Sequence, residues 1–196
     1  MKKGLFGFNV HDIVEIAIMC ALAIILDKFL KIPVSSAAGS INLSMLPILI
    51  LTLRHGWFKG FFAGGIVYGL ITCLLDAYGI ITYPLDYFLG FGSVALLGLF
   101  SKYIALNYGK NGQKTTLCYV FAILGVALWG VARCFASSLS SVLIYEYEWG
   151  AAIAYNIPYV FISAAADAIL LCLVLYVVNR LNKSFKTSYL KSLIKE

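Results

Sequence analysis

Long apolar runs separated by short polar breaks extend over most of this chain. The runs cover approximately residues 10–30, 43–54, 57–75, 85–104, 115–144 and 151–178. A helix needs about 20 mostly apolar residues to cross the hydrocarbon core of a bilayer. The run 43–54 is shorter and contains Pro47, which indicates a broken or tilted helix. The pattern predicts an all-α integral membrane protein, a bundle of about six transmembrane helices followed by a basic tail over 179–196.

Composition supports a single membrane domain over residues 1–196. Hydrophobic residues make up 62% of the chain and charged residues 12%, and the mean hydropathy is +0.91. A soluble domain has about 45–50% apolar and about 25% charged residues. The five cysteines lie inside apolar runs and form no CxxC pair, which favours small core residues over a metal site or disulfides.

Basic residues lie at helix ends and in the tails, although the net charge is +6. This placement argues against nucleic-acid binding, which needs a basic face. With six spans and both termini inside, the inner segments hold Lys2, Lys3, Arg54, Lys59, Lys102, Lys110, Lys114, Arg180, Lys183, Lys186, Lys191 and Lys195. The positive-inside rule therefore predicts cytoplasmic N- and C-termini in a multi-pass protein of the cell membrane. The outward loops then carry the acids Asp76, Glu146 and Glu148.

Among the ionisable residues of the predicted spans, three stand out, namely Asp86, Arg133 and Asp167. Burying charge in a membrane is expensive, so each is a functional candidate. Asp86 follows Pro84 and suits either a ligand contact or a helix start, where the helix dipole favours an acid. Arg133 and Asp167 suit a structural pair or other polar contacts between helices.

Motifs for catalysis are absent from the sequence. It contains no HExxH, GxSxG or Walker A motif, and its two histidines, His11 and His55, fall at the predicted cytoplasmic side. We therefore expect no catalytic residues, no cofactor and no bound metal. An intramembrane enzyme, such as a lipid-modifying transferase, is the alternative from another class, and a purely structural membrane partner is a third. The outward aromatic residues suit a cationic ligand.

Five short stretches of the sequence occur in an order that is typical of one group of membrane proteins. They are the small-residue pair Ala17 and Ala21, the stretch 39–48 with its glycine-serine start and Met-x-Pro end, Arg54-His55-Gly56 followed by Gly60, Gly64 and Gly69, Leu85-Asp86-Tyr87 with Phe91 and Gly98, and Tyr155-Asn156. Over residues 13–178 the chain resembles the substrate-binding membrane subunits of energy-coupling factor (ECF) vitamin transporters. The resemblance is strongest to the thiamine-specific branch.

The resemblance implies a substrate-capture subunit that binds thiamine, or a thiamine-like compound, at the outer face. It implies docking through Ala17 and Ala21 on a transmembrane coupling subunit, ATP hydrolysis on two partner ATPase subunits, and a lid over residues 31–42. The implied substrate-binding residues are Asp86, Tyr87, Asn156, Ser137, Tyr145 and Arg133.

Departures from the family pattern leave the ligand open. Ser137 stands where the branch usually has a histidine, Ala151 where it has a tyrosine, and Ser141 near an expected glycine. Asp86 is one methylene shorter than the usual glutamate, and Tyr145 replaces a tryptophan as the stacking ring. A different small vitamin or a precursor is therefore an alternative ligand.

Overall fold

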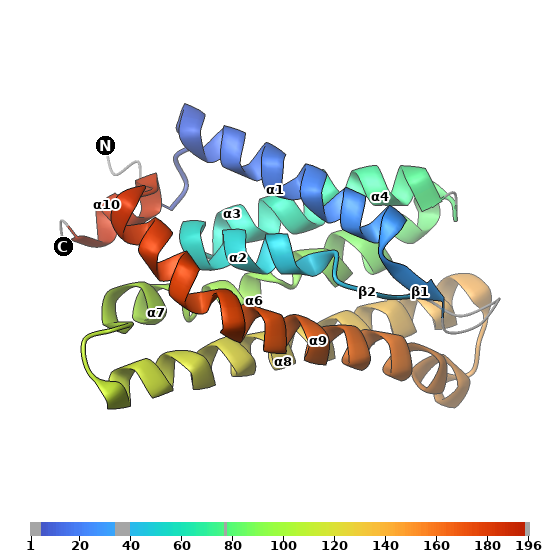
Figure 1. The fold of residues 1–196 in the computed structure, drawn as a ribbon. Coiled ribbons are helices and arrows are strands. Elements are labelled where there is room, and N and C mark those ends of the chain that lie inside the picture. Colours follow the sequence, from blue (N-terminus) through green and yellow to red (C-terminus); the bar gives the residue numbers. More distant parts are fainter. Residues whose placement is uncertain (1–4, 34–39, 77, 195–196) are drawn as a thin grey trace.

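A computed structural model describes residues 5–33, 40–76 and 78–194, which form an elongated bundle of helices (Figure 1). Residues 34–39 of the expected lid lie outside the described residues, as do Lys2, Lys3 and Lys195. Four helical segments of the described chain are long and apolar enough to cross a membrane: Trp57–Asp76, Ile80–Asn107, Gly112–Tyr145 and Trp149–Ser184. The predicted helical membrane bundle is thus confirmed at this coarser level, with one short pair of strands in addition.

The first helix, α1 (Val10–Phe29), is apolar in its middle and charged near both ends. Asp12 closes a capping box with Asn9 at its start, and Asp27 and Lys28 lie in its last turns. These charges distinguish α1 from the four segments above, although its 20 residues are long enough to cross a bilayer. After α1, strand β1 (Lys31–Pro33) pairs antiparallel with β2 (Ser40–Asn42).

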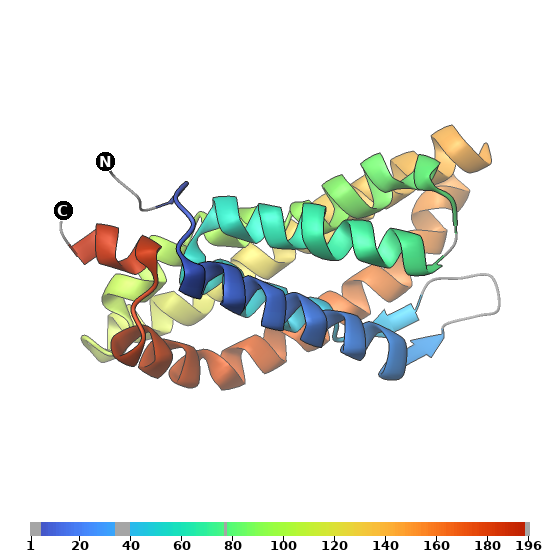
Figure 2. The same ribbon diagram turned by 90° about the horizontal axis from the view of Figure 1, so that it is seen from above.

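Helix α2 (Met45–His55) is short and continuous. Pro47 lies in its first turn, where a missing backbone N–H costs nothing, so the helix is not broken there. Eleven residues span only about 17 Å. Most of its side chains, including Ile48, Leu49 and Leu51, are buried, so other helices enclose most of α2, and α1 passes over it in the view from above (Figure 2).

The next two segments combine short helical pieces. The first comprises α3 (Trp57–Phe61), the π-helical η1 (Phe62–Tyr68) and α4 (Gly69–Asp76). The second comprises η2 (Ile80–Thr82), the π-helical η3 (Tyr83–Leu89), α5 (Gly90–Gly92), α6 (Ala95–Gly98) and α7 (Ser101–Asn107).

Glycines bring these two segments into close contact. A Cβ on Gly64 would lie 2.8 Å from the Phe91 carbonyl oxygen, and one on Gly65 would lie 2.8 Å from that of Phe88. No other residue type fits such an approach without displacing backbone. The small-residue spacing in the third run therefore serves helix packing, as it commonly does in lipid.

The last two long helices, α8 (Gly112–Tyr145) and α9 (Trp149–Ser184), pack antiparallel and are followed by α10 (Ser188–Ile194). Helix α9 continues to Ser184, six residues beyond the predicted end of the sixth span at 178. A tertiary contact accounts for the extension, since the Asn182 side chain accepts a hydrogen bond from Arg54 at 3.0 Å. Much of the predicted basic tail is thus helical.

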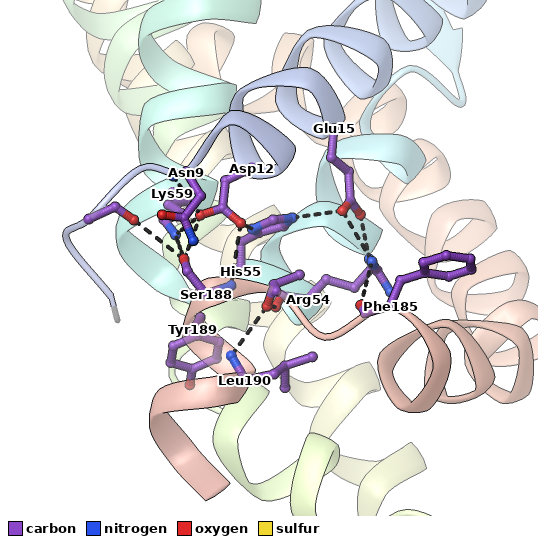
Figure 3. Close-up of polar contacts among 12 residues, drawn as sticks. Asn9, Asp12, Glu15, Arg54, His55, Lys59, Phe185, Ser188, Tyr189 and Leu190 are labelled. Atoms are coloured by element: carbon purple, nitrogen blue, oxygen red, sulfur yellow. Dashed lines mark hydrogen bonds and ion pairs between the residues drawn. The ribbon is translucent and has the colours of Figure 1, made fainter. Parts of the chain in front are cut away.

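Both termini lie at one end of the bundle, the termini end, and the β1–β2 strands and the α8–α9 turn lie at the opposite end, the hairpin end (Figures 1 and 2). A charge cluster at the termini end joins α1 to the start of α3 and to the first residue of α10 (Figure 3). The Lys59 ammonium lies 2.8 Å from an Asp12 carboxylate oxygen. The Ser188 hydroxyl donates to the same oxygen at 2.5 Å.

The other half of this cluster centres on Arg54, which donates two hydrogen bonds to Glu15. His55 lies between two acids of the first turns of α1, with Nδ1 3.4 Å from Asp12 and Nε2 3.1 Å from Glu15. Asp12, Arg54, His55 and Lys59 are all at most 3% exposed. Removing one partner from such a buried group typically costs about 3–5 kcal/mol, so the cluster fixes α1 against the turn Arg54-His55-Gly56.

Candidate ligand-binding site

The segment η3 presents the acid Asp86 at the hairpin end of the bundle. Pro84 lies in its first turn, and the wide π-helical turn that follows is a feature frequent at functional sites. The partly buried Asp86 carboxylate accepts a hydrogen bond from the Ser140 hydroxyl at 2.5 Å. This contact holds η3 against α8.

Helix α8 carries Arg133, Ser137 and Ser140 at spacings of four and three, which place them on one face. The Arg133 guanidinium lies over the Phe91 ring at 4.5 Å and near the Trp129 ring at 5.6 Å. Arg133 therefore faces η3 and α5 from inside the bundle, with cation–π contacts as its closest partners. Ser137 is buried one turn before Ser140.

Arg133 and Asp167 form no ion pair among the described residues. Both Asp167 carboxylate oxygens are buried on α9 without a hydrogen-bond partner in that part of the chain. A direct structural pair between the two, one of the interpretations of the sequence, is thus not what the structure shows.

Asn156 lies at the contact between α9 and α8 and is 1% exposed. Its amide donates to the Ala152 carbonyl at 2.8 Å and to the hydroxyls of Ser141 and Ser138 at 3.2 and 3.4 Å. Its side-chain oxygen accepts from the Tyr159 hydroxyl. Protein groups therefore engage every polar atom of Asn156.

The serine-rich stretch 137–141 of α8 connects these groups. Ser140 binds Asp86 on η3, and Ser138 and Ser141 contact Asn156 on α9. The structure thus brings Asp86, Ser137 and Asn156 to one region. Sequence reasoning missed Ser138, Ser140 and Tyr159. The high density of serines over 137–141 was the available signal for the two serines.

A row of tyrosine rings runs from the α8–α9 turn toward Asn156. Ring centroids are 6.4 Å apart for Tyr145 and Tyr147, 6.3 Å for Tyr147 and Tyr155, and 6.2 Å for Tyr155 and Tyr159. Tyr145 is 46% exposed, so its ring is accessible at the hairpin end. The turn is tight, since Glu146 adopts a left-handed conformation (φ 57°).

Tyr87 points away from α8. Its hydroxyl donates to Asp76 at the end of α4 at 3.1 Å, and its ring meets Phe91 edge-on at 5.7 Å. Asp86 and Tyr87 therefore hold η3 from two sides, toward α8 and toward α4.

The residues expected to dock on a partner lie elsewhere. Ala17 and Ala21 share the exposed face of α1 with Ile13, Val14 and Ile18. No group of three or more potential metal ligands occurs among the described residues.

Comparison with known proteins now identifies the family. The family model "Thiamine transporter protein (Thia_YuaJ)" matches residues 13–186. The chain belongs to this family. Its relatives include the thiamine transporter ThiT of Bacillus subtilis (strain 168), 28% identical over 189 residues that cover 89% of this chain and 95% of that protein.

A solved structure of ThiT from Listeria monocytogenes shares the fold, with a TM-score of 0.75 and 24% identity, covering 88% of this chain and 97% of that one. The expected resemblance to the thiamine-specific branch is therefore confirmed. The family consists of transporters, which favours transport over an intramembrane enzyme.

Proposed function

We propose that this chain is the substrate-capture subunit of an ECF-type vitamin importer and that it binds thiamine at the hairpin end. Membership in the thiamine transporter family supports the ligand, and one observation carries the site: the Asp86 carboxylate, held by Ser140 at 2.5 Å, lies at the same end of the bundle as the row of tyrosine rings. An ionised acid near aromatic rings suits the permanent positive charge of a thiazolium ring.

The energetics favour a cation over an anionic or neutral vitamin. A hydrogen bond or contact to a charged group is worth about 1.5–3 kcal/mol, which is about ten- to a hundredfold in affinity. Partial desolvation strengthens the attraction relative to bulk water. Aromatic rings such as Tyr145 add about 0.5–2 kcal/mol of cation–π attraction.

The remaining site residues receive roles that fit their contacts. Tyr145 supplies a stacking ring, Ser137 a hydroxyl close to Asp86, and Arg133 a fixed cation behind the acid. Asn156 reaches a ligand by exchanging its longest partner, Ser138 at 3.4 Å, for a ligand group. A different small vitamin or a precursor is the alternative ligand, because Ser137 and Ala151 replace the usual histidine and tyrosine of the branch.

The importer requires partners and a defined orientation. In this proposal the chain crosses the cell membrane six times. The six spans are the four long segments, α1 and the short α2. Both termini face the cytoplasm, and the hairpin end faces outward. A transmembrane coupling subunit docks on Ala17 and Ala21, and two ATPase subunits supply the energy, so this chain binds ligand without hydrolysing ATP.

The test is isothermal titration of the detergent-purified chain with thiamine. Asp86→Asn keeps an acceptor for Ser140 but removes the charge, and we expect binding at least about tenfold weaker. Glu146→Gln, at an exposed acid of the same end, is the matched control and should change affinity less than about twofold. Equal affinity of Asp86→Asn and wild type contradicts the site. Absence of thiamine binding by the wild type, with binding of a neutral vitamin, contradicts the ligand.

A further inference from the structure

A second acid at the hairpin end, Asp76, connects the ligand-binding segment to α1. One Asp76 carboxylate oxygen accepts a hydrogen bond from the Lys28 ammonium at 2.5 Å, and the other accepts from the Tyr87 hydroxyl at 3.1 Å. Lys28 lies in the last turn of α1, and Asp76 is the last residue of α4. The carboxylate therefore bridges two residues that are far apart in sequence.

Lys28 is itself held in place. Its ammonium lies 3.3 Å from Asp27, whose carboxylate accepts from the Asn42 amide at 3.0 Å. The Asn42 backbone N–H donates to Ser163 of α9 at 3.2 Å. Since Asp27 and Asn42 are each 8% exposed, the end of α1 is fixed to β2 and α9 by largely buried contacts.

The bond to Asp76 determines what Tyr87 can offer a ligand. A carboxylate can only accept, so the Tyr87 hydroxyl donates its one hydrogen to Asp76. The phenol oxygen then has only lone pairs for any other partner. The ring is 6% exposed and packed against Phe91, so its position depends on that anchor.

We propose that Asp76 is a positioning residue for Tyr87, and that Lys28 orients Asp76, so that the geometry of the ligand-binding segment depends on the position of α1. The inference rests on the proposed function and extends it. Lys28 is on the same helix as Ala17 and Ala21, so a displacement of α1 during docking changes Asp76 and, through it, Tyr87. From the sequence alone, Asp76 is one of several outward-facing acids.

The first test needs no ligand. The full chain is labelled with 3-fluorotyrosine, and the Tyr87 fluorine resonance is assigned by its loss in Tyr87→Phe. Asp76→Asn and Lys28→Met should both shift this resonance, whereas Lys31→Met, at an exposed lysine of the same end, should not. A Tyr87 resonance that both variants leave unchanged overturns the proposal, whatever the protein binds.

The second test measures thiamine affinity in a double-mutant cycle. Asp76→Asn and Lys28→Met should each weaken binding about tenfold, the loss of one charge-assisted hydrogen bond, and Lys28→Arg should restore most of it. In a Tyr87→Phe background the same substitutions should change affinity less than about twofold, because the group they position is gone. An undiminished effect in that background overturns the proposal. If the wild type does not bind thiamine, the proposed function fails, and the fluorine shift still decides the coupling between α1 and Tyr87.

Discussion

A few polar side chains connect α8 and α9, the two longest helices. Asn156 is the centre of this contact, with two serines of α8 and Tyr159 as partners. Interhelical hydrogen bonds in membranes average about 0.6 kcal/mol and reach about 1.7 kcal/mol. Because Asn156 has two such partners on α8 and also accepts from Tyr159 of its own helix, its contribution exceeds that of one average bond.

Asn156→Ala is therefore expected to destabilise the protein by about 1–2 kcal/mol, since it leaves the Tyr159 hydroxyl without its acceptor. The melting temperature in detergent measures the effect. Asn179→Ala is the matched control, because Asn179 is buried on the same helix about six turns away from the contacts of Asn156. A larger loss in the control than in Asn156→Ala would contradict the assignment.

At the scale of one element, α1 has two distinct faces. Ile16, Cys20 and Ala23 pack into the bundle, and Ala17 and Ala21 lie on the opposite, exposed side. Small residues one turn apart allow the backbone of another helix to approach closely. The exposed face is therefore suited to a helix of a partner protein.

Ala17→Trp combined with Ala21→Trp is expected to abolish uptake in cells that contain the partner subunits, because two indole rings prevent this approach. Thiamine binding by the purified variant should be unchanged, since the substituted face points away from Asp86. Ala127→Trp combined with Val131→Trp places the same rings on an exposed face of α8 and is the control. Normal uptake by the α1 variant, or lost uptake by the control alone, would exclude α1 as the docking element.

Over the whole molecule, polar groups gather at both ends of the bundle and leave apolar surface between them. The termini end holds the buried cluster around Asp12 and Arg54 (Figure 3). The hairpin end holds Asp86 and the tyrosine row. Basic residues such as Lys102 and Lys110 belong to α7 and the connection to α8, at the termini end. The positive-inside rule assigns that end to the cytoplasm.

Cysteine labelling tests this orientation. Lys110→Cys should react with an impermeant thiol reagent only after the membrane is opened, and Tyr147→Cys should react in intact cells, since both positions are exposed at opposite ends. A parent in which Cys172, the least buried native cysteine, is replaced by alanine provides the background. Labelling of Lys110→Cys in intact cells would invert the proposed topology.

Much of the candidate site was predictable, and for specific reasons. Asp86 and Arg133 stood out because a charge inside an apolar run is costly, whatever surrounds it. Ser138 and Ser140 did not stand out, because a serine hydroxyl within a helix can donate to a backbone carbonyl of the same helix and needs no distant partner. By sequence, Asp76 is one of three acids in the predicted outward loops. Only its hydrogen bonds to Lys28 and Tyr87 distinguish it from Glu146 and Glu148.

Local composition sufficed for the membrane class and the approximate helix positions, because crossing a bilayer imposes a length and hydropathy that each segment meets independently. The resemblance to the family rested instead on five short motifs in order. The enclosure of α2, the extension of α9 to Ser184 and the absence of an Arg133–Asp167 ion pair followed from tertiary packing alone. Each depends on which side chains from distant parts of the chain meet in space. Hydropathy and periodicity describe a helix and its faces, but they do not specify the neighbour that each face meets.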